Sequence, residues 1–392
     1  MFLNFYLKFL GLSLDSRKKN KSMLELVRSH WLYSVHFVSV NLEVLAQVLW
    51  VFEAVITGKS FVEITRLIPC LIFCLISDFK SGSILYYAHY NNEFIETMKG
   101  LLLKQMDDED EGNLFRKKVV DSHILMLSNI TQKITYLIIM GLPMFALSPM
   151  FITFTEYLKT HEIKLEVPFI AYYPFNEFDH RIYPFIYVHQ VWTAIVAMFM
   201  VYGPDCFFFT CCTFIHIQFS LLNHDMERIV NEDSHRCNRF KFKKLAVCHM
   251  ELIRCVNLLE EIFSKSILFN ALTSSVIICV TGFNVMVVDN IVMMASFTAF
   301  LIFGLMQIFL FCYYGDTIMR SSMQISDAIY NSQWYDIGVA ERKDFLIVLT
   351  RAQTPCELTA YGFFKINLQS FTSILSTSWS YFALLKTMYH PE

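Results

Sequence analysis

The stretch IVMMASFTAFLIFGLMQIFLFCYY (291–314) decides the fold, because its 24 residues include no charged side chain. A helix rises about 1.5 Å per residue, so roughly 20 apolar residues cross a bilayer core about 30 Å thick. Six further apolar stretches of similar length occur along the chain. We predict an all-α integral membrane protein with seven transmembrane helices, at about 33–57, 61–88, 130–154, 183–213, 266–288, 291–314 and 360–386.

The composition supports a membrane protein and excludes several other classes. Hydrophobic residues make up 55% of the chain and charged residues 17%, which is too apolar for an ordinary soluble domain. No gap between predicted spans exceeds about 50 residues, so we expect residues 1–392 to form one membrane domain. Basic residues are spread over several loops and form no patch for nucleic acid.

The distribution of positive charge predicts the orientation in the membrane. Lys and Arg number six in 1–32, five in 89–122, eight in 217–265 and four in 316–357, all on one side. The alternate segments carry only five. The positive-inside rule therefore places the N-terminus in the cytosol and the C-terminus outside. Seven spans in this orientation are the reverse of a G-protein-coupled receptor.

The sequence lacks the motifs of the common enzyme classes. It contains no glycine-rich phosphate loop, no serine-hydrolase elbow and no zinc-protease helix. The nearest approach to a metal site, between His235 and Cys255, lacks the close ligand pairs that zinc requires. None of the eleven cysteines falls in a predicted extracellular segment, so we expect no structural disulfide. We predict a protein that is not an enzyme and has no cofactor and no metal.

Three predicted cytosolic segments continue as helices beyond the membrane. Residues 214–232, 242–268 and 318–330 carry apolar side chains every three or four positions. These apolar faces must be buried against a partner. The simplest arrangement is a cytosolic bundle shared between neighbouring subunits, and the alternative is packing within one chain.

Several charged and proline residues lie inside predicted spans. Glu43 is near mid-membrane, where we favour a hydrogen-bonded packing residue over one that lines a cavity. Five charged residues from four spans lie near the cytosolic end of the membrane, which suggests ion pairs between helices or access to water there. They are Asp78, Lys80, Lys133, Asp205 and Lys365. Pro143 and Pro149 interrupt the third span and favour a distorted helix beside a cavity.

The last quarter of the chain indicates a family. QIFLFCYYGDTIMRSSMQISDAIYNSQWYD (307–336) and FFKINLQSFTSILSTSWSYFALL (363–385) resemble the C-terminal signature of insect odorant receptors. VPFIAYYPFNEFDHRIYPFIYVHQ (167–190) is similar to the family's second extracellular loop. Gustatory receptors share the topology but usually carry a Gln-Phe pair in the seventh span, which is missing here. The matching residues are Gln307, Cys312, Gly315, Ser322, Ala328, Tyr330, Ser332, Trp334, Ser380, Tyr381, Phe382, Leu384 and Leu385.

The resemblance implies an odorant-binding subunit of a ligand-gated, non-selective cation channel in the plasma membrane of olfactory sensory neuron dendrites. Members of the family assemble as tetramers with a co-receptor subunit around one central pore. The segment 217–265 is too short for the extended loop of the co-receptor, so the chain looks like an odorant-tuned subunit. The alternatives are a metabotropic seven-span receptor, which the inverted charge bias disfavours, and a transporter, for which no repeat is visible.

The outer halves of four spans supply candidate ligand contacts. A volatile ligand offers few hydrogen-bonding groups, so an apolar pocket with isolated polar points suits it. Aromatic, methionine and small residues are frequent in these half-spans. The expected ligand-binding residues are Cys70, Phe73, Cys74, Met140, Gly141, Met144, Phe145, Ser148, Tyr187, Gln190, Ala194, Met198, Met293, Phe297 and Phe300.

The outer end of the seventh span supplies a candidate gate. Apolar side chains that several subunits contribute to a ring can close a pore by expelling water, and the pore opens when the helices separate. The alternative is a stripe that faces lipid. The expected pore and gate residues, at helical spacing, are Ser380, Tyr381, Leu384, Thr387 and Met388.

Overall fold

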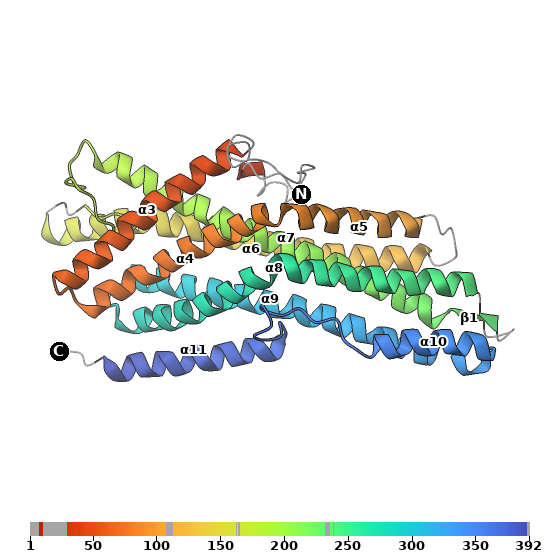
Figure 1. Ribbon diagram of the computed structural model, residues 1–392. Coiled ribbons are helices and arrows are strands. Elements are labelled where there is room, and N and C mark those ends of the chain that lie inside the picture. Colours follow the sequence, from red (N-terminus) through yellow and green to blue (C-terminus); the bar gives the residue numbers. More distant parts are fainter. Residues whose placement is uncertain are drawn as a thin grey trace.

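The structure is a computed structural model that describes residues 8–10, 30–106, 113–161, 163, 165–231, 236–237 and 239–389. Long helices run roughly parallel in one elongated bundle (Figure 1). Two strands of two residues, β1 (Val230–Asn231) and β2 (Arg236–Cys237), pair antiparallel at one end. The main helices are α3 (Trp31–Ile56), α4 (Phe61–Tyr86), α5 (Ala88–Met106), α6 (Asn113–Thr160), α7 (Tyr183–Glu227), α8 (Arg239–Val287), α9 (Ile291–Asn331), α10 (Val339–Ala352) and α11 (Leu368–Met388).

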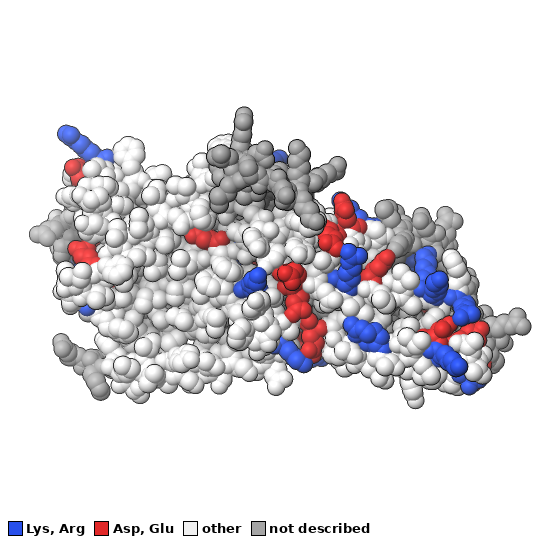
Figure 2. Space-filling view, viewed as in Figure 1, with Lys and Arg blue, Asp and Glu red and all other residues white. Residues whose placement is uncertain are grey.

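The bundle has two halves of different surface chemistry. Lys, Arg, Asp and Glu gather over α5, α10 and the adjoining ends of α7, α8 and α9, whereas the surface over α3, α4 and α11 is nearly free of charge (Figure 2). We call these the charged half and the apolar half. Helices α4, α7 and α9 begin in the apolar half and run toward the charged half (Figure 1).

The predicted spans coincide with helices. In the described part of the chain, five helices are long and apolar enough to cross a membrane, namely α3, α6, α7, α8 and α9. The other two predicted spans correspond to α4, which carries Glu63, Arg66, Asp78 and Lys80, and to α11, which is rich in serine and threonine. The all-helical class is confirmed, and the number of crossings stays a prediction.

The seventh span was predicted too long at its start. Helix α11 begins at Leu368, not at 360, because the chain first makes a turn in which Tyr361 and Gly362 have positive φ. Asn367 then caps the helix, since its side chain accepts a hydrogen bond of 2.9 Å from the backbone N–H of Ser370. The turn packs on α9 at Gly315, where a Cβ would lie 2.3 Å from the carbonyl oxygen of Ile366. Any side chain at this position would displace the turn.

The core of the charged half is formed within one chain. In α8 the apolar stripe Leu252, Cys255 and Leu259 is fully buried, as is Ile325 of α9. The helices predicted at 242–268 and 318–330 are therefore confirmed as parts of α8 and α9. The helix predicted at 214–232 continues α7 but was predicted too long, because α7 ends at Glu227 and Val230–Asn231 pair as β1 with β2. Packing within one chain accounts for these faces, which the sequence had assigned more simply to contacts between subunits. A cytosolic bundle shared between subunits stays a prediction, and it would use faces of these helices other than the buried ones.

Candidate functional site

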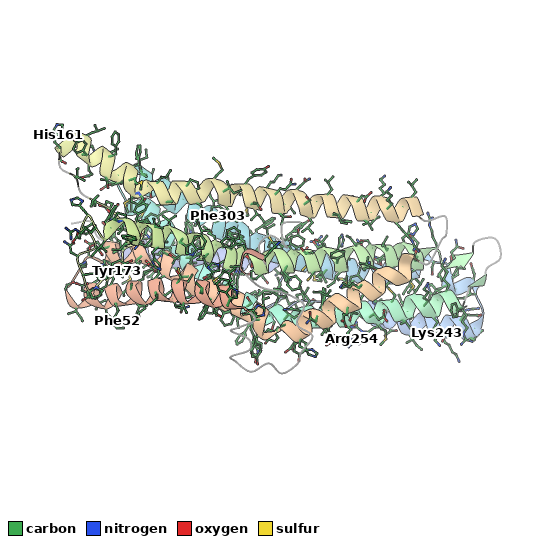
Figure 3. The ribbon with its side chains drawn as sticks, turned by 90° about the horizontal axis from the view of Figure 1, so that it is seen from above. Phe52, His161, Tyr173, Lys243, Arg254 and Phe303 are labelled. Atoms are coloured by element: carbon green, nitrogen blue, oxygen red, sulfur yellow. The ribbon has the colours of Figure 1, made fainter. Side chains whose placement is uncertain are left out.

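An apolar cavity lies in the apolar half, between α4, α6, α7 and α9. We call it the inner chamber, and its volume is about 60 Å³. Gly141 of α6 makes room for Phe303 of α9, whose ring would be 3.2 Å from a Cβ at that position and lies between α6 and α7 (Figure 3). The lining residues are Cys70, Phe73, Cys74, Gly141, Leu142, Phe169, Thr193, Ala194, Ala197, Met198, Ser296, Ala299, Phe300 and Phe303.

A second, larger cavity adjoins the first on the side of the loop between α6 and α7. This outer chamber measures about 230 Å³ and shares Cys70, Phe169, Ser296 and Phe300 with the inner chamber. Its wall also includes a bend in α6, which curves on its approach to His161 (Figure 3) beyond the in-helix prolines. The other lining residues are Arg66, Leu67, Pro69, Ser148, Pro149, Ile152, Glu166, Val167, Pro168, Ile170, Met293 and Phe297.

A polar cluster fixes the loop residue Phe169 against the chambers. The side chain of Gln190 accepts a hydrogen bond of 3.0 Å from the N–H of Phe169 and donates one of 3.1 Å to its carbonyl oxygen. Gln190 also donates to the hydroxyl of Tyr173 at 3.0 Å and to Glu43 at 3.4 Å. Glu43 is buried and hydrogen-bonded, as the sequence favoured. Gln190 and Glu43 therefore position the loop.

A buried ion pair lies beyond the inner chamber, on the side of the charged half. The Lys80 ammonium donates to Asp205 at 2.7 Å, and Gln307 donates to the second oxygen of Asp205 at 2.6 Å. The same ammonium lies 4.9 Å from the centroid of the Phe311 ring. Of the two interpretations left open by the sequence, ion pairs between helices or access to water, the structure shows an ion pair for Lys80 and Asp205. The ion pair and Gln307 join α4, α7 and α9. On each helix they lie four to seven residues, or about 6–10 Å, beyond the last residue that lines the inner chamber.

The structure brings ten of the fifteen predicted ligand residues to the two chambers. Met140 is 67% exposed, which places it away from both chambers. Tyr187 donates its hydroxyl proton to the carbonyl of Ala146, and Gln190 holds Phe169, so neither lines a chamber. The side chains of Met144 and Phe145 lie outside the described residues. Those that line a chamber are Cys70, Phe73, Cys74, Gly141, Ser148, Ala194, Met198, Met293, Phe297 and Phe300.

Sequence reasoning missed several lining residues. Ala197 lies three positions after Ala194 on α7, and Ser296 and Ala299 bracket the predicted Phe297 on α9, so helical spacing could have found all three. Phe169 gave no such signal, because it lies in a loop without regular structure and reaches the chamber only through its contacts with Gln190.

Helix α11 presents two unlike faces. Ser378 is buried and Phe382 packs beside Gly282 of α8, where a Cβ would meet the ring at 3.5 Å. The opposite face is open, with Trp379 and every predicted pore residue exposed. Those pore residues are Ser380, Tyr381, Leu384, Thr387 and Met388, which span one side of the helix at about 100° per residue.

The described residues hold no metal-binding group and no disulfide. No cluster of three or more His, Cys, Asp or Glu side chains with suitable geometry occurs among them. Ten cysteines of the described part are free, and most are buried in the bundle. The sequence came nearest to a metal site between His235 and Cys255, and His235 lies outside the described residues.

On its loop side, the outer chamber is lined by the acidic residue Glu166. Partial burial and the neighbouring Glu156 raise the pKa of Glu166, and Arg66 opposes this rise. The hydroxyl of Tyr183 donates to the backbone carbonyl of Glu166 at 2.8 Å, which holds the loop against the start of α7.

A family model agrees with the fold and covers most of the chain. The model described as 7tm odorant receptor matches residues 60–379. The chain is 24% identical to putative odorant receptor 85d of Drosophila melanogaster over 98% of its own length and 92% of the relative. It is also 24% identical to odorant receptor 85c of the same species, over 96% and 95%.

Solved structures share the arrangement of helices. The insect olfactory receptor OR5 from Machilis hrabei, in complex with eugenol, superimposes with a TM-score of 0.82. The match covers 99% of this chain and 97% of that one at 14% identity. OR5 without the ligand gives a TM-score of 0.80. At this identity the likeness establishes the fold alone.

Proposed function

Because this chain belongs to the odorant receptor family, we propose that it is the odorant-binding subunit of a ligand-gated, non-selective cation channel. The observation that carries the proposal is the inner chamber, an apolar space lined by four helices and one loop residue. A volatile organic molecule bound there would lose contact with water, which contributes about 25 cal/mol per Å² of apolar area before the cost of ordering.

The polar groups around the chambers suit a ligand with few hydrogen-bonding atoms. Thr193 and Ser296 line the inner chamber but donate their hydroxyl protons to backbone carbonyls at 2.9 and 3.0 Å. They leave only acceptor capacity toward a ligand. Shape and apolar contact therefore provide most of the affinity in the inner chamber.

The open face of α11 suits a pore-lining helix. In a monomer, Tyr381, Leu384 and Met388 are 54%, 57% and 71% exposed. Four such helices around an axis would form an apolar constriction that closes by dewetting. A ligand opens the pore to the extent that it binds the open arrangement more tightly than the closed one.

Assembly with a co-receptor subunit follows from the same reasoning. We propose a heterotetramer in which this chain supplies the odorant chamber, in the plasma membrane of olfactory neuron dendrites, with a cytosolic N-terminus and an extracellular C-terminus. The charge asymmetry of the loops supports this orientation. Tags at each terminus of intact cells test it, and a C-terminal tag reached only after permeabilisation contradicts it.

The experiment compares two tryptophan substitutions on one helix. Ala299 of α9 lines the inner chamber, whereas Ala295, one turn away, is exposed. Cells that express each variant with the co-receptor are tested with a panel of volatiles, and currents are recorded in excised patches without nucleotide. Ala299→Trp should abolish the response of the wild type, and Ala295→Trp should keep it. A response that requires nucleotide would instead indicate metabotropic coupling.

A further inference from the structure

Arg66 is the only lysine or arginine that lines either chamber within the described residues. It lies on α4, four residues before Cys70, which borders both chambers. Residues four apart on a helix share a face, with Cβ atoms about 6 Å from each other. The Cβ of Arg66 therefore lies about one helical turn from that of Cys70, which both chambers share.

The Nε–H group of Arg66 is buried and has no hydrogen-bond partner. Buried donors are nearly always satisfied, so an orphan donor that lines a cavity points to a group that the protein alone does not supply. A guanidinium stays protonated at any physiological pH and can only donate. The missing partner is therefore an acceptor.

The nearby acid does not fill this role. Glu166 lines the same chamber and its pKa responds to the charge of Arg66, but no ion pair within 4.0 Å joins the two. Glu63, three residues before Arg66, is exposed at the start of α4. The chamber thus holds one cation whose inner N–H is unpaired, beside a wall that is otherwise mainly apolar.

We propose that Arg66 selects ligands that carry a carbonyl or carboxylate oxygen, which accepts the Nε–H bond in the outer chamber while the hydrocarbon part enters the inner chamber. This inference rests on the proposed function. It assigns ketones, aldehydes, esters and carboxylic acids as the ligand class. It excludes hydrocarbons, which offer no acceptor, and protonated amines, which Arg66 repels.

The test measures binding of four six-carbon probes to the purified receptor–co-receptor complex in detergent. The probes are 2-hexanone, hexanoic acid, hexane and hexylamine. A hydrogen bond to a charged donor should make 2-hexanone and hexanoate bind about tenfold more tightly than hexane. Arg66→Met, which keeps the apolar stem and removes the donors, should abolish this preference. Arg181→Met, in the exposed loop, should leave it unchanged.

Three results would overturn the inference. They are equal affinity for 2-hexanone and hexane in the wild type, a preference that survives Arg66→Met, and the absence of binding by any oxygen-bearing probe. A lipid headgroup is another source of acceptor oxygens, so the probes are also tested with added phosphatidylglycerol. Displacement of 2-hexanone by this lipid in the wild type but not in Arg66→Met would assign Arg66 to lipid.

The Ala299→Trp variant separates this inference from the proposed function. If the inner chamber is the binding site, Ala299→Trp abolishes binding of every probe that binds the wild type. Binding that persists in Ala299→Trp contradicts the chamber itself. Binding that is lost there, without a preference for oxygen-bearing probes in the wild type, contradicts only the role of Arg66.

Discussion

The two halves of α7 show how differently one helix is used along its length. From Met200 to Thr213 nearly every residue is buried, because α4, α8 and α9 surround this stretch. Nearer its start, Ala194 and Met198 border the inner chamber instead. Close packing of this middle stretch stabilises the fold, whereas the start of α7 forgoes packing contacts where a ligand can bind.

The ion pair of Lys80 and Asp205 lies at the boundary between these two regimes. It joins the three chamber-lining helices α4, α7 and α9 at the end of the chamber nearer the packed core, and so holds them together there. We therefore predict that substitutions in this ion pair or in the charged half affect stability. Substitutions on the chamber side of the ion pair should affect the response to ligand.

The largest effect is expected from Asp205→Ala. The substitution leaves the Lys80 ammonium buried without its partner, which should destabilise the fold by about 3–5 kcal/mol. Thermal unfolding of the purified complex and the yield at the cell surface measure this loss. Glu357→Ala breaks the exposed pair with Lys365 and should cost only about 0–1 kcal/mol. Equal losses in the two variants would contradict the buried role of Asp205.

A replacement of the pair sharpens this test. In the double variant Lys80→Met with Asp205→Leu, no charge remains buried, so most of the lost stability should return. A double variant as unstable as Asp205→Ala would show that the charges themselves, and not their pairing, are needed.

The same substitution at two places on α8 compares the halves directly. Leu252 is fully buried in the charged half, and Leu272 is 62% exposed in the apolar half. Leu252→Ala should destabilise the protein by about 2–5 kcal/mol through the cavity it leaves, and Leu272→Ala should have a small effect. Melting temperatures of the two variants are the measurement. A larger loss at Leu272 would reverse the comparison.

A smaller effect is expected at the loop clamp. Gln190→Leu removes both hydrogen bonds to the backbone of Phe169, which should shift the concentration of odorant for half-maximal current by about tenfold, equivalent to about 1.4 kcal/mol. Surface yield should change little by comparison with Asp205→Ala. Gln132→Leu, at an exposed position on α6, is the control. Unchanged responses in Gln190→Leu would remove Phe169 from the chamber's function.

The smallest effect on stability is expected at the pore. Leu384 is 57% exposed on α11, so Leu384→Ser should change stability by less than about 0.5 kcal/mol. It should nevertheless raise the basal current, since a polar ring admits water more readily than an apolar one. Patch-clamp recording without odorant measures this current, and Leu272→Ser provides the control. A closed state like that of the wild type would exclude Leu384 from the gate.

Much of the chamber could be predicted because helical periodicity restricts which residues share a face. Cys70, Phe73 and Cys74 follow one face of α4 and all reach the chamber. Met140 is as apolar as its neighbours on α6, yet it is exposed. Periodicity could not predict this, because it cannot tell which side of a helix faces the bundle when both sides are apolar. The orphan donor of Arg66 is likewise invisible in the sequence.

The sequence by itself determined most of the helices and the family, because apolar stretches long enough to cross lipid and charged loops between them leave few other folds. The tertiary structure alone decided the pairing of Lys80 with Asp205, which lie 125 positions apart, and the capture of Phe169 by Gln190. Such contacts depend on the tilt and rotation of each helix against its neighbours, and many side chains acting together set those angles.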